Sequence, residues 1–173
     1  MSKTSISSLA LFAGLVLAGG LPAQAAVFMD AEWAQGACEA WNQDPVLTEG
    51  LAQSGWIDND KGRGYKAIHI YRHDCAKSPR IELTLSKQDG KAMCVYGGAV
   101  KHQKLDDGAD YVMYAKTKRW MEMGRGEYGP MKAMMFGRLA FEGPMWEAMK
   151  NMGPFKAFLL IAGKVPGDTS SCP

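Results

Sequence analysis

The sequence has no large excess of charge of either sign, because 20 lysines and arginines stand against 18 aspartates and glutamates. A nucleic-acid-binding protein is expected to present a basic face, so this balance argues against a nucleic-acid partner. It also offers no strong electrostatic attraction to an anionic membrane. The chain has no internal repeat, low-complexity run or interdomain linker, which favours a single domain.

The patterns of metal binding and catalysis are also missing. No two cysteines have the C-x-x-C spacing of a zinc site, and the glycine-rich stretch 124–129 lacks the Lys-Ser/Thr of a phosphate loop. His69 and His73 lie in a stretch with strand periodicity, where residues four apart are separated by about 13 Å. We expect both histidines and His102 to be surface or hydrogen-bonded residues, and Cys75 to be oxidised and unable to attack. No catalytic residue, metal or cofactor is therefore predicted.

No apolar run reaches the length of about 20 residues that a membrane span requires. Residues 1–25 instead have the three parts of a secretory signal peptide. Lys3 supplies the positive charge, a short apolar core follows, and positions 23–25 form a small-x-small cleavage site. We expect cleavage after Ala25 and a location in the periplasm or outside the cell, with residues 26–173 forming the domain.

Cysteine is scarce but even in number, with Cys38, Cys75, Cys94 and Cys172. In an exported chain, four cysteines predict two disulfides, and the sequence leaves all three pairings open. Each bond would stabilise the fold by about 2–4 kcal/mol. A bond to Cys172 would also hold a C-terminal tail that would otherwise fray.

Periodicity predicts helices at both ends of the domain and a sheet between them. Helical spacing of apolar residues, with Asp30 as an N-cap, indicates an N-terminal helical part over 26–58. Alternation with period two predicts a sheet within 65–142, in which Asp89-Gly90 forms a hairpin turn. The five expected strands are 65–73, 81–86, 92–100, 110–116 and 138–142.

Three further helices are predicted around the last strands. One is capped by Thr117, and a Met-rich one starts at Pro130, where the missing N–H costs nothing. The third is an apolar C-terminal helix over 144–163, which Gly153-Pro154 should kink. Helices that flank a sheet built mainly from hairpins place the chain in the α+β class.

Methionine is concentrated in one region, because eight of the twelve methionines lie between 121 and 152. Its flexible, polarisable side chain suits a surface that adapts to apolar ligands, whereas a core with one packing favours Leu and Ile. This density favours an apolar ligand cavity over simple core filling. Copper binding by Met121-x-Met123 and Met131-x-x-Met134 is an alternative, which would require these residues in an exposed segment.

The second half of the chain resembles the sterol carrier protein type-two family. The likeness covers about residues 109–163, and its hallmark Gly-Lys-Leu-x-x-x-Gly strand appears here as Gly137-Arg-Leu-Ala-Phe-Glu-Gly143. The motifs occur in order: Asp-Tyr-Val-Met at 110–113, Trp120, Gly-Glu-Tyr-Gly-Pro at 126–130 and the Met-rich run 131–143. The resemblance implies a five-stranded, mostly antiparallel mixed sheet covered by helices around an apolar tunnel. It also implies non-catalytic binding of a fatty acyl chain, a sterol or a hopanoid-like lipid.

The chain departs from the family in two ways. Family members are commonly intracellular and rarely depend on disulfides, whereas this chain has an export signal and four cysteines, and Gly153-Pro154 should kink the C-terminal helix and reshape the tunnel. These departures prevent transfer of a specific ligand. We expect a soluble lipid carrier that contacts membranes transiently. The alternative is a protein-interaction module that docks through a Met- and Trp-rich apolar face. From the apolar faces of the resembling segment, the predicted lipid-binding residues are Met113, Trp120, Met134, Met135, Leu139, Phe141, Met145, Met149, Phe155, Phe158 and Leu159.

Overall fold

The computed structural model describes residues 26–173, so the predicted signal peptide lies outside the described residues. The strands are β1 Lys66–Arg72, β2 Ile81–Gln88, β3 Lys91–Ala99, β4 Tyr111–Ala115 and β5 Ala140–Glu142. The helices are α1 Ala31–Asn42, α2 Pro45–Thr48, α3 Gly50–Gln53, the 3-10 helix η1 Trp56–Asp58, α4 Thr117–Gly124, α5 Pro130–Met135, α6 Met145–Lys150 and α7 Met152–Lys164. The predicted α+β class is confirmed.

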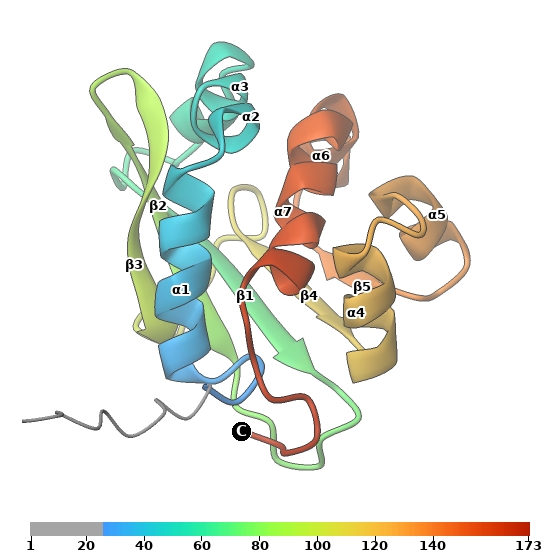
Figure 1. The fold of residues 1–173 in the computed structure, drawn as a ribbon. Coiled ribbons are helices and arrows are strands. Elements are labelled where there is room, and N and C mark those ends of the chain that lie inside the picture. The colour runs from blue at the N-terminus through green and yellow to red at the C-terminus, as the bar shows by residue number, and fades with distance from the viewer. Residues whose placement is uncertain (1–25) are drawn as a thin grey trace, which may run out of the picture.

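The five strands form one open sheet in the order β3-β2-β1-β4-β5 (Figure 1). The central pair β1 and β4 is parallel and the other three pairs are antiparallel, which confirms the predicted mixed, mostly antiparallel sheet. The β2–β3 hairpin turns at the expected Asp-Gly pair. Asp89 and Gly90 have φ values of 48° and 75°, as a two-residue hairpin turn of this type requires.

Helix α1 lies against β2 and β3 on the face of the sheet that carries the core. The Asp30 carboxylate accepts a hydrogen bond from the backbone N–H of Trp33 and so caps the helix as predicted. The helix approaches β3 closely because of Gly97, where an added Cβ would lie 2.1 Å from the Ala34 carbonyl oxygen. The same device joins α4 to α7, whose backbones meet at Gly124 and Gly163.

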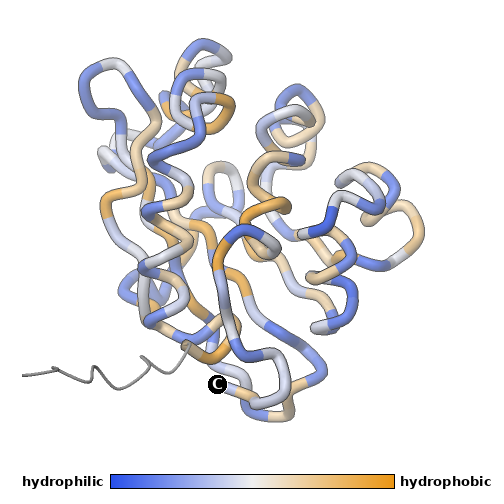
Figure 2. Tube along the Cα trace, viewed as in Figure 1, coloured by the Kyte–Doolittle hydropathy of each residue, from blue (hydrophilic) through white to orange (hydrophobic). Residues whose placement is uncertain are grey.

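The interior lies between this helical layer and the sheet. Apolar segments, orange in Figure 2, gather where α7 lies over the central strands, and the peripheral loops are mainly blue. Ile68, Ile70 and Leu83 from the sheet belong to one buried cluster with Trp33 from α1 and Phe158 from α7. The apolar residues that alternate along the strands and those on one face of each helix therefore pack together in a single core.

The C-terminal helical segment breaks earlier than the sequence predicted. The non-helical residue is Asn151, at φ −115° and ψ 34°, while Gly153 and Pro154 lie in the first turn of α7. In a continuous helix the Pro154 ring would clash with the carbonyl of Lys150, four residues earlier. Separating the two helices at Asn151 removes that clash and places the proline where its missing N–H costs nothing.

Thr117 does not cap α4, contrary to the prediction. It is the first residue of the helix, and the N-cap is Lys116, which makes no side-chain capping bond. The Thr117 hydroxyl is already used, because it donates to Asp74 and accepts from the Arg72 guanidinium. The side chain therefore joins β1 to α4 instead of satisfying the helix N-terminus.

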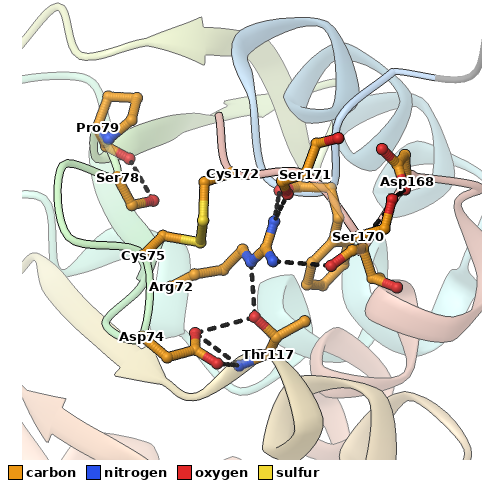
Figure 3. The surroundings of a disulfide bond; sticks show 12 residues. Arg72, Asp74, Cys75, Ser78, Pro79, Thr117, Asp168, Ser170, Ser171 and Cys172 are labelled. Carbon is orange, nitrogen blue, oxygen red and sulfur yellow. Dashed lines mark hydrogen bonds between the residues drawn. A yellow bond between two sulfur atoms is a disulfide. The ribbon is translucent and has the colours of Figure 1, made fainter.

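All four cysteines form disulfides, Cys38–Cys94 between α1 and β3, and Cys75–Cys172 between the turn after β1 and the C-terminal tail (Figure 3). The tail is held a second time by the buried Arg72, whose guanidinium donates to the backbone carbonyls of Thr169 and Ser171. The predicted disulfides are confirmed, and they indicate folding in an oxidising compartment outside the cytosol.

The opposite face of the sheet carries a buried carboxylate. Glu82 accepts hydrogen bonds from His69, Thr84 and the backbone and ring nitrogens of His102. Burial alone would raise the pKa of Glu82, but these hydrogen bonds outweigh it and hold the pKa well below its ordinary value. Asp110 behaves in the same way: burial alone would raise its pKa, but hydrogen bonds from the Arg63 guanidinium and from the backbone N–H groups of Asp106 and Ala67 together lower it.

We expect the protein to lose stability in acid because of these two carboxylates. A carboxyl with a lowered folded pKa stabilises the fold above its unfolded pKa, and that contribution disappears as the pH falls below about 4.5. Urea unfolding should therefore show a progressive loss of stability as the pH falls from 7 into strong acid. Glu82→Gln should be less stable at neutral pH and show a smaller acid dependence. An acid dependence identical to that of the wild type would contradict this role.

Candidate functional site

The main pocket lies between the sheet and the helices, at the end of the domain where α2, α3 and α6 each contribute a residue to its wall. It encloses about 40 Å³, or about 370 Å³ when all unoccupied space up to the open solvent is counted. The enclosed part has room for about three water molecules. Its lining is almost entirely apolar and comprises Trp41, Leu47, Leu51, Trp56, Ile68, Tyr111, Met113, Phe141, Ala148, Asn151, Pro154, Phe155 and Phe158.

Six aromatic rings follow one another around this pocket. Neighbouring ring centroids lie 5.5–6.3 Å apart, within the range of favourable aromatic pairs. The order is Phe158, Trp41, Trp56, Tyr111, Phe141 and Phe155. These rings come from distant parts of the chain, so the pocket exists only once the whole domain has folded. A wall of this kind binds by shape and apolar contact.

One edge of the pocket is polar and fully paired. Lys66, at the start of β1, is completely buried, and its Nζ lies 3.0 Å from the Glu147 carboxylate of α6. The Tyr111 hydroxyl donates to the same carboxylate and accepts from Trp56 Nε1 at 2.9 Å. Lys66 Nζ also lies 4.2 Å above the Trp56 ring. This network fastens α6 to the sheet beside the pocket.

The network shifts the pKa of two of its members. Burial lowers the pKa of Lys66, although the hydrogen bond to Glu147 opposes this effect. Burial also raises the pKa of Tyr111, and the neighbouring Glu147 carboxylate raises it further. The Tyr111 hydroxyl therefore stays protonated and acts as a hydrogen-bond donor at neutral pH.

A second, smaller pocket lies between α1, α7 and the central strands. Its lining includes Trp120, and it shares Phe158 with the main pocket. The Trp120 indole N–H donates to the Tyr71 carbonyl at 3.2 Å. Phe158 therefore separates two small apolar spaces along the inner side of α7.

The structure brings together four of the eleven residues predicted to bind lipid, because Met113, Phe141, Phe155 and Phe158 line the main pocket. Trp120 lines the second pocket. The other six do not line either pocket. Leu139 and Leu159 are buried in the core, Met134 is partly buried against it, and Met135, Met145 and Met149 are exposed.

The N-terminal part of the lining was not predicted from the sequence. Trp41, Leu47, Leu51 and Trp56 come from α1 to η1. The first three were assigned only to helix faces, and no role was predicted for Trp56. Helical periodicity identifies an inward face, but it does not distinguish a residue in a packed core from one that borders a cavity. No local signal in these helices would have made that distinction.

The polar residues considered for catalysis or metal binding lie apart from the pocket. His69 is bonded to Glu82, His73 is exposed, and Cys75 is in a disulfide. Within residues 26–173, no group of three or more His, Cys, Asp or Glu side chains is arranged to hold a metal. Of the methionines considered for copper, Met123 is buried and Met131 is exposed. None of the helices in this part of the chain is long and apolar enough to cross a membrane.

The family model described as the SCP-2 sterol transfer family matches residues 55–156. A crystal structure of sterol carrier protein 2 has a TM-score of 0.52 at 21% identity, covering 80% of this chain and 98% of that chain. A conserved hypothetical protein from Thermus thermophilus, described as possibly a sterol carrier protein, gives 0.49 at 20%, covering 83% and 95%. The apo form of sterol carrier protein 2 from Yarrowia lipolytica gives 0.38 at 15%, covering 74% and 88%. No curated protein matches this sequence.

Proposed function

Because this chain belongs to the SCP-2 sterol transfer family, we propose that it binds an apolar lipid and carries it in the periplasm without catalysing a reaction. The observation that carries this proposal is the aromatic-walled pocket, most of which lies within the matched residues 55–156. The family match supports lipid or sterol binding in general. The ligand class proposed for this chain is a fatty acyl chain, a sterol or a hopanoid-like lipid.

The proposed domain organisation follows from the same reasoning. Residues 1–25 form a cleaved signal peptide, and residues 26–173 form one lipid-binding domain. Two disulfides support a compartment in which cysteines are oxidised. The periplasm or the cell exterior meets that condition, and the signal-like composition of residues 1–25 fits export.

The pocket must enlarge to accept a lipid, because about 40 Å³ is too small for an acyl chain. The wall that separates the pocket from solvent is α6, a six-residue helix that contributes Ala148 and ends at Asn151. Its Glu147 is held to the sheet by Lys66 and Tyr111, so α6 moves only when these contacts separate. We propose that outward movement of α6 enlarges the main pocket and that rotation of the Phe158 side chain joins it to the second pocket. The enlarged cavity would form the apolar tunnel expected from the family resemblance.

Such a pocket suits exchange rather than permanent storage. Removing an acyl chain from water gains about 0.8 kcal/mol per CH₂, so useful affinity does not require a charged anchor. A bilayer offers the same chain a similar gain. The protein therefore exchanges lipid with a membrane whenever the pocket and the bilayer solvate the chain almost equally well.

The proposal is tested by native mass spectrometry of protein purified from the periplasm, followed by extraction and identification of the bound lipid. We expect a defined lipid to be bound with a stoichiometry of about one. Protein that is always empty and that takes up neither fluorescent fatty acids nor fluorescent sterols would contradict the proposal.

Filling the pocket should weaken binding. Ala148 faces the pocket from α6, and Ala148→Phe would place a phenyl ring in the enclosed space. Because overpacking a close-packed site costs about 1–3 kcal/mol, we expect roughly 5- to 150-fold weaker binding of a fluorescent fatty acid. Ala31→Phe, at the exposed start of α1, is the matched control and should bind normally. Circular dichroism would verify that both variants fold, and equal affinities would place the ligand elsewhere.

A further inference from the structure

The exposed large apolar side chains are concentrated at one place. Of the eight in residues 26–173, six lie on or next to α5 and α6, while Val46 and Val95 lie elsewhere. We call these six the α5–α6 apolar surface: Met131, Met135, Phe136, Met145, Trp146 and Met149. Exposed apolar residues scattered singly need no explanation, whereas a concentration of this kind indicates a surface that binds a partner.

The two helices lie on the same side of the molecule. Both pack against α7, the chain between them contains the edge strand β5, and both lie away from α1 and β3 (Figure 1). Met135 and Trp146, one from each helix, are each 71% exposed. Neither helix buries these side chains against another element of the described chain, so the surface is free for a partner.

The solvent-exposed charged side chains next to the α5–α6 apolar surface are mainly positive. Lys132 and Lys150 are exposed, and Arg138 is partly exposed. Lys150 Nζ lies 5.8 Å above the Trp146 ring, and the Arg138 guanidinium lies 5.9 Å from the Phe136 ring centroid.

Of the two carboxylates between Met131 and Lys150, only one faces solvent. Glu147 faces inward to Lys66, which leaves Glu142 as the exposed acid. Aromatic and methionine side chains flanked by lysine and arginine are typical of protein surfaces that enter the headgroup region of a bilayer. The positive excess fits anionic lipid headgroups.

The same segments form the wall of the pocket on their inner side. Ala148 of α6 and Phe141 of β5 line the main pocket, while Trp146 and Met149 of α6 face outward. A lipid leaving a bilayer that contacts this surface would therefore have one short helix to pass. A protein partner would account for the exposed apolar residues but not for their position over the pocket.

We propose that the α5–α6 apolar surface is the docking surface for a lipid bilayer that contains anionic lipid. The inference deepens the proposed function, because docking at this surface places the bilayer next to the wall through which the ligand enters. Phe136 and Trp146 enter the interface, and Lys132, Arg138 and Lys150 contact the anionic headgroups.

Vesicles test the proposal directly, and Trp146 supplies the readout. The other four tryptophans, at positions 33, 41, 56 and 120, are buried. A blue shift and protection from acrylamide on adding vesicles of phosphatidylcholine and phosphatidylglycerol would therefore report on Trp146. We expect this shift together with co-flotation of the protein, and binding about ten-fold weaker to vesicles of phosphatidylcholine alone.

A pair of matched variants locates the surface. Phe136→Ser combined with Trp146→Ser should weaken flotation by about ten-fold or more, because both side chains lose their insertion energy. Val95→Ser removes an exposed apolar side chain on β3 and should float like the wild type. Flotation that is unaffected by the double variant would overturn the proposal. It would also be overturned if the wild type failed to bind vesicles but formed a dimer that the double variant loses.

Failure of this inference can be distinguished from failure of the proposed function. Flotation requires no ligand in the pocket, and uptake of a soluble fluorescent fatty acid requires no vesicle. A wild-type protein that takes up the fatty acid but does not float with vesicles would refute the docking surface alone. Normal flotation of a protein that takes up no lipid would refute the proposed function alone.

Discussion

A Glu147→Gln variant is expected to unfold about 3–5 kcal/mol more easily than the wild type at neutral pH. The reason is Lys66, whose side chain is completely buried and has Glu147 as its carboxylate partner at 3.0 Å. Glutamine keeps one acceptor oxygen beside the Trp56 carbonyl and the neighbouring rings, but it supplies no negative charge, so the ammonium group stays in the interior uncompensated. Urea unfolding at pH 7 measures the loss directly.

The variant should also respond to pH in a characteristic way. The pKa of Lys66 is already lowered by burial, and removing Glu147 takes away the interaction that opposes this effect. At pH values between the folded and the unfolded pKa of Lys66, the unfolded chain then binds more protons than the folded chain. The free energy of unfolding should therefore rise with pH in that range. A loss that stays constant between neutral and alkaline pH would contradict this explanation.

Two further variants distinguish the effect of the buried ion pair on stability from the effect of an exposed ion pair. Glu49→Gln breaks the exposed pair with Lys91, in which both side chains are about half exposed, and should cost less than about 1 kcal/mol. Lys66→Met combined with Glu147→Leu removes both charges and should recover most of the stability, because a buried pair is often replaceable by apolar residues. A double variant as unstable as Glu147→Gln would show that the loss comes from shape instead of charge.

Removing the disulfide between Cys75 and Cys172 should have a comparable effect. The bond closes a loop across 97 residues, and the chain-entropy model assigns such a loop about 4–5 kcal/mol. With both cysteines replaced by alanine, the tail would be held mainly by the Arg72 hydrogen bonds to its carbonyls. We expect a lower urea midpoint and rapid proteolysis of the last residues.

The other disulfide provides the matched control. Replacing Cys38 and Cys94 by alanine opens a loop across 56 residues and should cost about 4 kcal/mol, yet it should leave the tail protected. Equal tail cleavage in the two variants would contradict the specific role of Cys172. Thiol titration of the unfolded, unreduced wild type should detect almost no free thiol, and four free thiols would refute both bonds.

The sequence predicted those parts of the fold that are encoded by local interactions. Asp30 supplies the hydrogen bond that starts α1, and Asp89-Gly90 supplies the two positive φ values of the hairpin. Alternation identified all five strands because each has one face in the core, and the likeness around Gly137–Gly143 identified the family. These features depend on residues close together in the chain.

The pocket was harder to predict because its walls come from distant parts of the chain. Helix α6 illustrates the difficulty: its apolar residues Met145 and Met149 face outward, whereas Glu147 faces inward. An amphipathic pattern normally places the charge outside. The reversal depends on Lys66, which lies 81 positions earlier and has no sequence feature that marks it as buried.

The pairing of the two disulfides affects how the native bonds can form during oxidation. Cys38 joins Cys94, and Cys75 joins Cys172, so each bond encloses one cysteine of the other. A chain that enters an oxidising compartment from its N-terminus presents Cys75 to Cys38 before Cys94 arrives. Oxidation in order of arrival would therefore trap a non-native bond, and reaching the native pairs requires thiol–disulfide exchange. A chain oxidised in this order therefore needs disulfide isomerisation as well as oxidation to reach its native pairs.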